Sequence, residues 1–470
     1  MEFEQSALMV DVEQIINGGS NPVHFTVGAT ILVTTTNTIV NPIKVTGIDL
    51  RRDYLNRYSD ELIITTEILA GQYSNLVYPY KNAVDITLTR TPLMEVGDTP
   101  DAGSTVQSER FTATLLDEGS PLLEQNTPFA PTQPNLDLTG PVTVQFQLVN
   151  KALEQMRMMD VGQVFRGCSV DDAIRTVLTN ASQTTTVDGQ RTVQGVTMIP
   201  SANPTPREHI VIPHGVRLVD VPQHIQKHCG GVYNAGMGYF LQGNQWYVYP
   251  ALDTTRFNSA AANSPTLTVL NVPSNKFPQV ERTYRQSGTN LMVMATGSVK
   301  FRDPSNHAQL NLGNGVRFSD ASKFMDGFVS VSDNRALASR GSVNNEFIGT
   351  SRPNGNNNVH VSGNPVNANS LEEYSNLARA MGASITMEWE NSNPDLIVPG
   401  MPAQVLFLQN EQIQTLTGVV IGAQHYTQMR GQGFSASRYV TTTHLNIFLQ
   451  PQDQTSPASA TGAGTPQDAS

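Results

Sequence analysis

The chain has 470 residues, of which 39% are apolar and 15% are charged, and its formal net charge is −11. This length predicts two to four domains, and the apolar content is sufficient for folded cores. The 40 acidic side chains outnumber the 29 basic ones, and the basic residues form no continuous block. Both features argue against tight or sequence-specific nucleic-acid binding.

The N-terminus and the cysteines give no sign of export. Residues 1–5, Met-Glu-Phe-Glu-Gln, lack the positive start of a secretory signal, and no run of about 18 apolar residues predicts a membrane span. Cys168 and Cys229 fit neither a disulfide framework nor a metal motif. We therefore expect reduced thiols and assembly in a cytoplasm.

Residues 1–150 are predicted to form antiparallel β-structure. An apolar-then-threonine run at 29–36 precedes three segments in which apolar and polar residues alternate. The alternating apolar positions are Val84, Ile86 and Leu88, then Phe111, Ala113 and Leu115, then Val142, Val144, Phe146 and Leu148. A period of two predicts strands with one face against a core. Five prolines within 119–141 predict a loop.

Residues 151–280 mix helix and strand signals. Lys151 to Asp160 is predicted as a short helix, and Ser169 with Asp172 predicts the capped start of a second helix. Asp220 is predicted to cap a third, with Pro222 in its first turn and a Gly-Gly pair after its end.

The strongest hairpin signal in the chain follows these helices. Tyr239–Gln242 and Gln245–Tyr249 flank Gly243-Asn244, a pair suited to a turn with positive φ. The five aromatic side chains of this hairpin either pack against one another across the strands or form a platform for a sugar. Cross-strand packing is the simpler interpretation.

Residues 281–450 are predicted to form a second β region. Leu291 to Ala295 is strand-like, and three strands close the region: one after the Pro399-Gly400 corner, one at 416–423 and one at 439–449.

The polar stretch 302–369 is predicted as an inserted arm that makes subunit contacts. A capping box at Ser370 opens a predicted helix. Residues 451–470 have the composition of a disordered tail.

A group of potential metal ligands surrounds the third predicted helix: His209, His214, His224, His228 and Cys229. His224 and His228 share a helix face, and three or four such ligands could hold zinc. The glutamate of an H-E-x-x-H motif is absent, however, and Lys227 would place a positive charge beside the cation. We predict no metal site.

Catalytic signatures are missing as well. The sequence has no G-x-S-x-G elbow and no phosphate-binding glycine loop. The carboxylate pairs Asp171-Asp172 and Glu372-Glu373 could in principle cleave a glycoside, but both fall in first helical turns, where capping explains them. We therefore predict no catalytic residue, no cofactor and no enzyme activity.

Three parts of the sequence carry a family likeness. They are the run Ile210–Pro213, Leu218–Ile225 and Gly230–Tyr233, the Tyr239–Pro250 hairpin, and the unit from Pro399-Gly400 to His425-Tyr426 with its final Thr-rich strand. In this order the chain resembles the baseplate hub proteins of contractile phage tails. That family is akin to phage late control protein D and to the hub of type VI secretion spikes.

The resemblance implies a β-rich α+β fold with two tube-like antiparallel β domains, at 1–150 and 281–450, joined by a mixed α/β domain at 151–280. It also implies a homotrimer in the virion baseplate that matches a sixfold tail tube to a threefold central spike. Implied partners are the tail tube protein, the central spike protein and other baseplate proteins, with DNA passing through the lumen.

Two alternatives remain open at this stage. One is a tail-associated hydrolase that cuts the cell wall, and the other is a glycan- or receptor-binding tail module.

Overall fold

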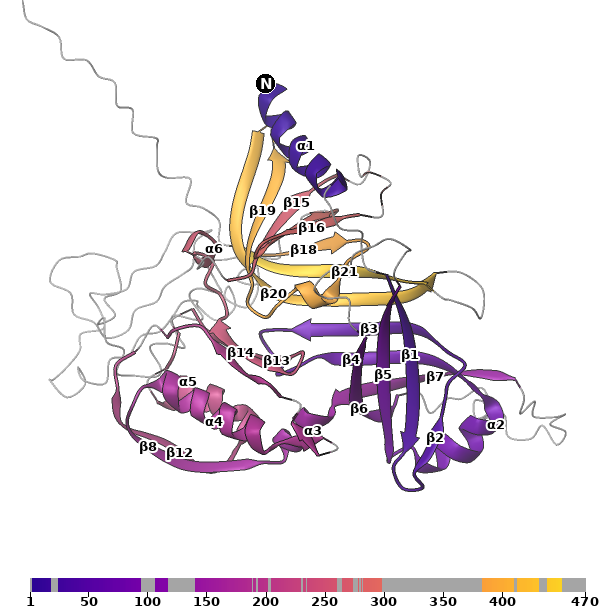
Figure 1. Cartoon of the computed structure of the whole chain (residues 1–470). Coiled ribbons are helices and arrows are strands. Elements are labelled where there is room, and N and C mark those ends of the chain that lie inside the picture. The colour runs from indigo at the N-terminus through magenta and orange to yellow at the C-terminus, as the bar shows by residue number, and fades with distance from the viewer. Residues whose placement is uncertain are drawn as a thin grey trace, which may run out of the picture.

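The computed structural model describes residues 2–17, 24–93, 106–116, 140–187, 189–191, 193–201, 204–229, 231–233, 235–259, 264–273, 278, 280, 282–297, 383–409, 412–430 and 438–449. The predicted arm at 302–369, the helix after Ser370 and the tail at 451–470 lie outside these residues. Within them the fold is β-rich α+β, as predicted (Figure 1). None of the helices in these ranges is both long enough and apolar enough to cross a membrane.

Eight strands pair into a closed circuit that we call the first ring. Six come from the N-terminal third and two from the C-terminus: β1 (His24–Val33), β3 (Lys44–Asp53), β4 (Glu61–Leu69), β5 (Val84–Leu93), β6 (Gln107–Leu115), β7 (Pro141–Asn150), β20 (Gln412–Arg430) and β21 (Arg438–Leu449). The order of pairing is β20-β3-β4-β7-β6-β5-β1-β21, and β21 returns to β20. Short β2 (Thr38–Val40) adds to β1.

The alternating residues predicted from the sequence fill this first ring. Ile86, Phe111, Val144 and their neighbours on each strand are buried in one apolar cluster. The helical turns α2 (Ala70–Gln72), η1 (Tyr73–Val77) and η2 (Tyr78–Tyr80) join β4 to β5, and Tyr73 and Val77 belong to the same cluster. Burial of one face of every strand is the interaction that favours closure.

A second ring shares β20 and β21 with the first. Its other strands are β15 (Thr266–Asn271), β17 (Asn290–Ala295), β18 (Ala383–Trp389) and β19 (Pro402–Gln409), with β16 (Tyr284–Ser287) paired to β17. A single bridge between Thr296 and Glu388 joins the end of β17 to β18 and completes the circuit. Helix α1 (Glu2–Asn17) packs on this ring, with Ile15 buried against Leu270 and Met294.

The second ring corrects the expectation of purely antiparallel sheets. Strand β15 runs parallel to both of its neighbours, β17 and β19. A tight hairpin turn cannot join parallel strands. Accordingly, both neighbours of β15 come later in the chain and are separated from it by other segments. The other pairings of this ring are antiparallel.

The middle of the chain forms a separate apolar core beside the rings (Figure 1). It holds α3 (Lys151–Arg157), α4 (Val170–Thr184), η3 (Leu218–Asp220), α5 (Val221–His228), the ribbon of β8 (Asp160–Cys168) with β12 (Arg207–Arg217), and the sheet of β11 (Gly195–Met198), β14 (Gln245–Pro250) and β13 (Met237–Gln242). The small pair β9 (Thr186–Val187) and β10 (Gln190–Arg191) follows α4, and α6 (Arg256–Ser259) follows β14.

Local signals in this middle region are largely confirmed. Ser169 Oγ accepts a hydrogen bond from the Asp172 amide at 3.1 Å and so caps α4. Gly243 and Asn244 both adopt positive φ in the β13–β14 turn. The helix predicted over Lys151 to Asp160 ends at Arg157, because Asp160 already begins β8.

The predicted role of Asp220 as a side-chain cap is wrong. Its carboxylate makes no capping bond to α5 and instead accepts hydrogen bonds from the Tyr58 hydroxyl at 2.9 Å and from Arg217 at 2.7 Å. A charged partner and a half-buried phenol compete successfully with backbone amides for this carboxylate.

Gly400 connects the hairpin to the second ring and generates a stability prediction. Its φ is +64°, and a Cβ atom there would lie 2.1 Å from the Tyr249 ring. We expect Gly400→Ala to lower the free energy of unfolding by about 3 kcal/mol, from backbone strain plus overpacking. Calorimetric melting should show the loss.

Gly288→Ala is the matched control. Gly288 has a φ of +61° but nothing within 4 Å of the added Cβ, so only the strain of about 1 kcal/mol applies. Equal losses for the two variants would contradict a tight contact between Tyr249 and Gly400.

Candidate functional site: the junction between the rings

A polar layer closes one end of the apolar first ring. On β3, β5, β6 and β7, and just before β4, the side chain one inward-facing step beyond the apolar run is polar. These residues are Arg52, Asp60, Arg90, Glu109 and Asn150. The register brings them to the same end: Leu50 pairs with Leu62, Leu62 with Leu148, Leu88 with Glu109, and Phe111 with Asn150. We call these five residues the polar layer.

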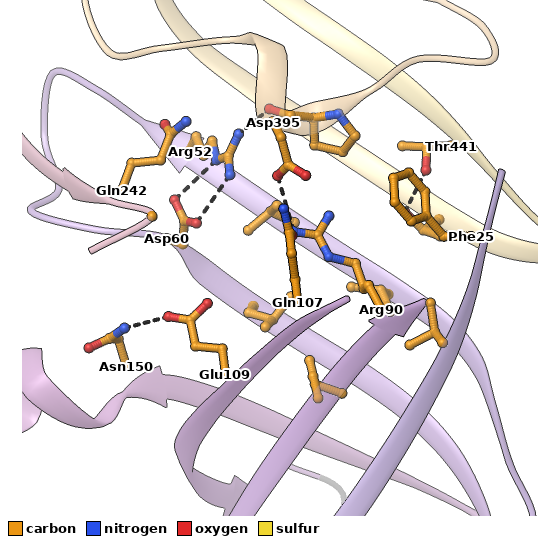
Figure 2. Close-up of a pocket in the computed structure, with 18 of the residues that line it drawn as sticks. Phe25, Arg52, Asp60, Arg90, Gln107, Glu109, Asn150, Gln242, Asp395 and Thr441 are labelled. Carbon is orange, nitrogen blue, oxygen red and sulfur yellow. Dashed lines mark hydrogen bonds and ion pairs between the residues drawn. The ribbon is translucent and has the colours of Figure 1, made fainter. Parts of the chain in front are cut away.

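Arg52 is the best-buried charge in the polar layer, with 6% of its surface exposed. Its Nε and Nη2 donate to the two oxygens of Asp60 at 3.1 and 3.3 Å, and its Nη1 donates to the Pro394 carbonyl at 2.6 Å. Pro394 belongs to η5 (Pro394–Leu396), which precedes β19 of the second ring. One guanidinium therefore ties the two rings together (Figure 2).

The charges of this pair follow from burial and mutual attraction. Burial alone would lower the pKa of Arg52, but the facing Asp60 outweighs it, so the pKa of Arg52 is raised. Burial raises the pKa of Asp60, and Arg52 opposes that change. An ion pair at this depth requires fixed geometry, because either charge alone would be costly to bury.

The segment joining β3 to β4 attaches the middle region to the end of the first ring where Arg52 and Asp60 lie. The Tyr54 hydroxyl donates to Gln242 Oε1 at 3.0 Å, and Gln242 Nε2 donates to the Ile397 carbonyl at 2.6 Å. The Tyr249 hydroxyl donates to the Tyr54 carbonyl at 2.9 Å. First ring, hairpin and second ring are thus joined by consecutive buried hydrogen bonds, and we call this place the junction.

Beside the polar layer lies a cavity of about 560 Å³. Its walls come from the first ring, the β13–β14 turn at Leu241–Asn244 and the segment around Asp395. Arg90 crosses it, donating through Nη2 to Gln107 Oε1 at 2.7 Å and to Asp395 Oδ1 at 3.1 Å (Figure 2). This is a second charged link between the rings.

His425, on the shared strand β20, is fully buried near the two arginines. Its Nδ1 lies 2.7 Å from Thr443 Oγ1, which in turn lies 2.6 Å from Ser392 Oγ, and its Nε2 has no hydrogen-bond partner among the described residues. Burial lowers the pKa of His425 well below its usual value, and the charges of Arg52 and Arg90 lower it further. The imidazole is therefore neutral.

The structure places the potential metal ligands on two elements, α5 and β12. The rings of His224 and His228 lie 4.8 Å apart, and His224 Nε2 lies 3.2 Å from the Val211 carbonyl. The ring of His214 packs over Gly162 instead. In the part of the chain that the structure describes, no three His, Cys, Asp or Glu side chains are grouped to hold a metal ion. Cys168 and Cys229 are both free thiols.

The hairpin aromatics and the first carboxylate pair have structural roles. Trp246 and Phe240 are fully buried and Tyr249 nearly so, which confirms packing and leaves no aromatic platform at these three residues. The Asp172 carboxylate accepts a hydrogen bond at 2.7 Å from the hydroxyl of Ser169, the residue that caps α4, and Asp171 accepts one from the Ser201 amide at 2.9 Å. The other pair, Glu372-Glu373, lies outside the described residues.

Comparison with known proteins gives only remote likenesses. No family model matches the sequence, and no curated protein matches it significantly. Similar solved structures include the 43 kDa tail protein of prophage MuSo2 from Shewanella oneidensis, with 9% identity, 90% of this chain and 98% of that chain covered, and a TM-score of 0.44.

Two further likenesses involve secretion-system proteins. The lidded Francisella PdpA-VgrG complex shows 11% identity, 93% and 55% coverage, and a TM-score of 0.33. The E. coli c3393 protein, a type VI secretion component described as similar to T4 bacteriophage tail proteins gp27 and gp5, shows 9% identity, 87% and 74% coverage, and a TM-score of 0.37. Because every TM-score lies below 0.5, these likenesses carry no argument here.

The buried pair at the junction predicts an asymmetric mutational response on β3. Arg52→Met leaves Asp60 without its buried counter-ion, and we expect a loss of about 3–5 kcal/mol in the free energy of unfolding. Arg51→Met, one residue away, removes an exposed partner of Asp49 and should cost less than about 1 kcal/mol. Denaturant unfolding of both variants checks the difference, and similar losses would contradict the proposed importance of the junction.

His425 predicts a pH dependence of stability. Its folded pKa is depressed, so the unfolded chain takes up a proton below about pH 6.5 and the folded chain does not. Stability present above that pH should therefore fall by about 1.4 kcal/mol by pH 5.5.

His425→Phe should remove this pH-dependent component, because phenylalanine does not titrate. Thr443 keeps Ser392 as its hydrogen-bond partner in this variant. His444→Phe, on the neighbouring strand, is the control and should keep the decline. Thermal unfolding measured at several pH values distinguishes the two variants. An unchanged slope in His425→Phe would show that other groups cause the decline.

Proposed function

We propose that this chain is a structural protein of a phage tail, a baseplate hub that connects the tail tube to the central spike. One observation carries the proposal: each chain holds two closed β-rings that share strands β20 and β21. Three copies around an axis would present six rings, which matches sixfold symmetry on one side and threefold symmetry on the other.

The junction suits a role in transmitting force. The two rings are joined by backbone pairing along β20 and β21, by Arg52 and by Arg90, so neither can rotate freely against the other. The low charged fraction of 15% and the polar strand faces suit surfaces that pack against other subunits. These features support the resemblance seen in the sequence around residues 210–233 and 399–426.

In this proposal the three predicted domains, at 1–150, 151–280 and 281–450, are kept as the main units, although β15 from the middle range joins the second ring and β20 and β21 from the last range also complete the first. Three chains form a homotrimer in the virion baseplate that contacts the tail tube protein, the central spike protein and other baseplate proteins. DNA passes along the axis without specific binding, and the net charge of −11 favours passage over adhesion.

A trimer has a mass of about 153 kDa, three times the 51.1 kDa of one chain. We expect light scattering at micromolar concentration to give this mass, and images of single particles to show a threefold ring with an open centre. Obligate subunit interfaces of this kind usually bury more than about 2,000 Å² in total.

A stable monomer at that concentration would contradict the hub proposal. The same preparation tests the hydrolase alternative on a cell-wall zymogram, which should stay blank. A cleared zone from a monomer would favour an enzyme instead. Binding to host cells by the monomer would favour the receptor-binding module.

A further inference from the structure

The cavity beside the polar layer holds more carboxylates than cations. Asp60, Glu109 and Asp395 line it together with only two arginines, Arg52 and Arg90, and these are the charged side chains of its described lining. Arg52 pairs with Asp60, and Arg90 pairs with Asp395. Among the described residues no cation lies within ion-pair distance of Glu109, and the described lining of the cavity carries one more formal negative charge than positive.

The Glu109 carboxylate is only partly satisfied by hydrogen bonds. Asn150 Nδ2 donates to its Oε1 at 2.6 Å, and no other residue in the described ranges donates to this carboxylate. Figure 2 shows this single dashed contact, with Glu109 set apart from both arginines. Burial and the negative charge of Asp60 raise the pKa of Glu109, and the hydrogen bond from Asn150 and the charges of Arg90 and Arg52 offset only part of this rise. A desolvated carboxylate with spare acceptor capacity is a site where a positive charge is stabilised.

The rest of the cavity suits a hydrocarbon stem. Leu88 lies directly opposite Glu109 in the β5–β6 pairing, and Leu62, Ile48 and Leu50 continue the apolar wall. The volume of about 560 Å³ falls within the usual range for small-ligand sites.

The cavity also has access to solvent. Val106, with 61% of its surface exposed, and exposed Ser108 are among its lining residues, so the space reaches the surface. A ligand with an apolar stem and a charged head could enter without the rings separating.

We propose that this cavity binds an aliphatic cation, an ammonium or guanidinium group on a hydrocarbon stem, with Glu109 as its counter-ion. The cation is either the lysine or arginine side chain of another protein or a free aliphatic diamine, which share this chemistry. The inference rests on the cavity of a single chain and is independent of the trimer.

Isothermal titration calorimetry of the full chain at pH 7.5 and low salt tests the proposal. The probes are N-acetyl-lysine methylamide, putrescine and, as the uncharged analogue, N-acetyl-norleucine methylamide. We expect saturable binding of at least one cation and none of the norleucine compound. Glu109→Gln should weaken cation binding about tenfold or more, the effect of losing a hydrogen-bonded charge.

Glu109→Gln is suited to the test because its side-chain oxygen can still accept from Asn150, so the polar layer keeps that hydrogen bond. Glu67→Gln is the matched control: Glu67 lies on β4 outside the cavity, paired with Lys44, and its loss should leave the titration unchanged.

Tighter binding of the lysine compound points to a partner protein's side chain, and tighter binding of putrescine points to a free diamine. No binding of either cation, or equal binding by wild type and Glu109→Gln, would overturn the proposal. Light scattering on the same samples reports the oligomeric state separately, so a failure here is distinguishable from failure of the hub proposal.

Discussion

The arrangement of the three parts of this chain depends on a buried guanidinium. Arg52 lies where the apolar interior of the first ring ends, and each of its three guanidinium nitrogens donates a hydrogen bond, two of them to Asp60 and one to a carbonyl of the second ring. A buried charge tolerates little displacement, because each lost hydrogen bond leaves it unsolvated in a poorly polarisable surrounding. Arg52 therefore fixes geometry more than it contributes net stability.

The junction illustrates a division between adhesive and positioning interactions. Apolar burial holds each ring and the middle region together, and the cluster of the second ring also takes in Phe240 and Tyr249 of the hairpin. Apolar contacts have little directional preference, so they alone would allow the parts to slide. The polar contacts of Arg52, Tyr54 and Gln242 are directional, and each spans two parts, so they select one mutual orientation.

Much of the local fold could be predicted from the sequence. The alternation around Ile86, Phe111 and Phe146 identified strands and their buried faces, and Gly243-Asn244 identified the hairpin turn. These signals are local, so one sequence is sufficient. The pairing of β1 with β21 and the parallel placement of β15 were not predictable, because they depend on contacts between residues far apart in the chain.

The candidate site was missed, although a signal was present. Arg90 continues the inward series of Val84, Ile86 and Leu88, and Glu109 precedes the series beginning at Phe111. A charged residue in an inward register position marks the point where a strand leaves its core. Only the ring topology shows that these residues, which come from several strands, meet at one end of the first ring. His425 carried no such pattern and could be found only through its burial.

The sharing of β20 and β21 also has a consequence for how the chain is synthesised. Phe25 on β1 pairs with Tyr439 on β21, so β1 is synthesised long before the strand that completes its circle of hydrogen bonds. Folding of the N-terminal half must therefore remain incomplete during translation, with open strand edges that are prone to misassociation. Neither ring can close before β21 has left the ribosome.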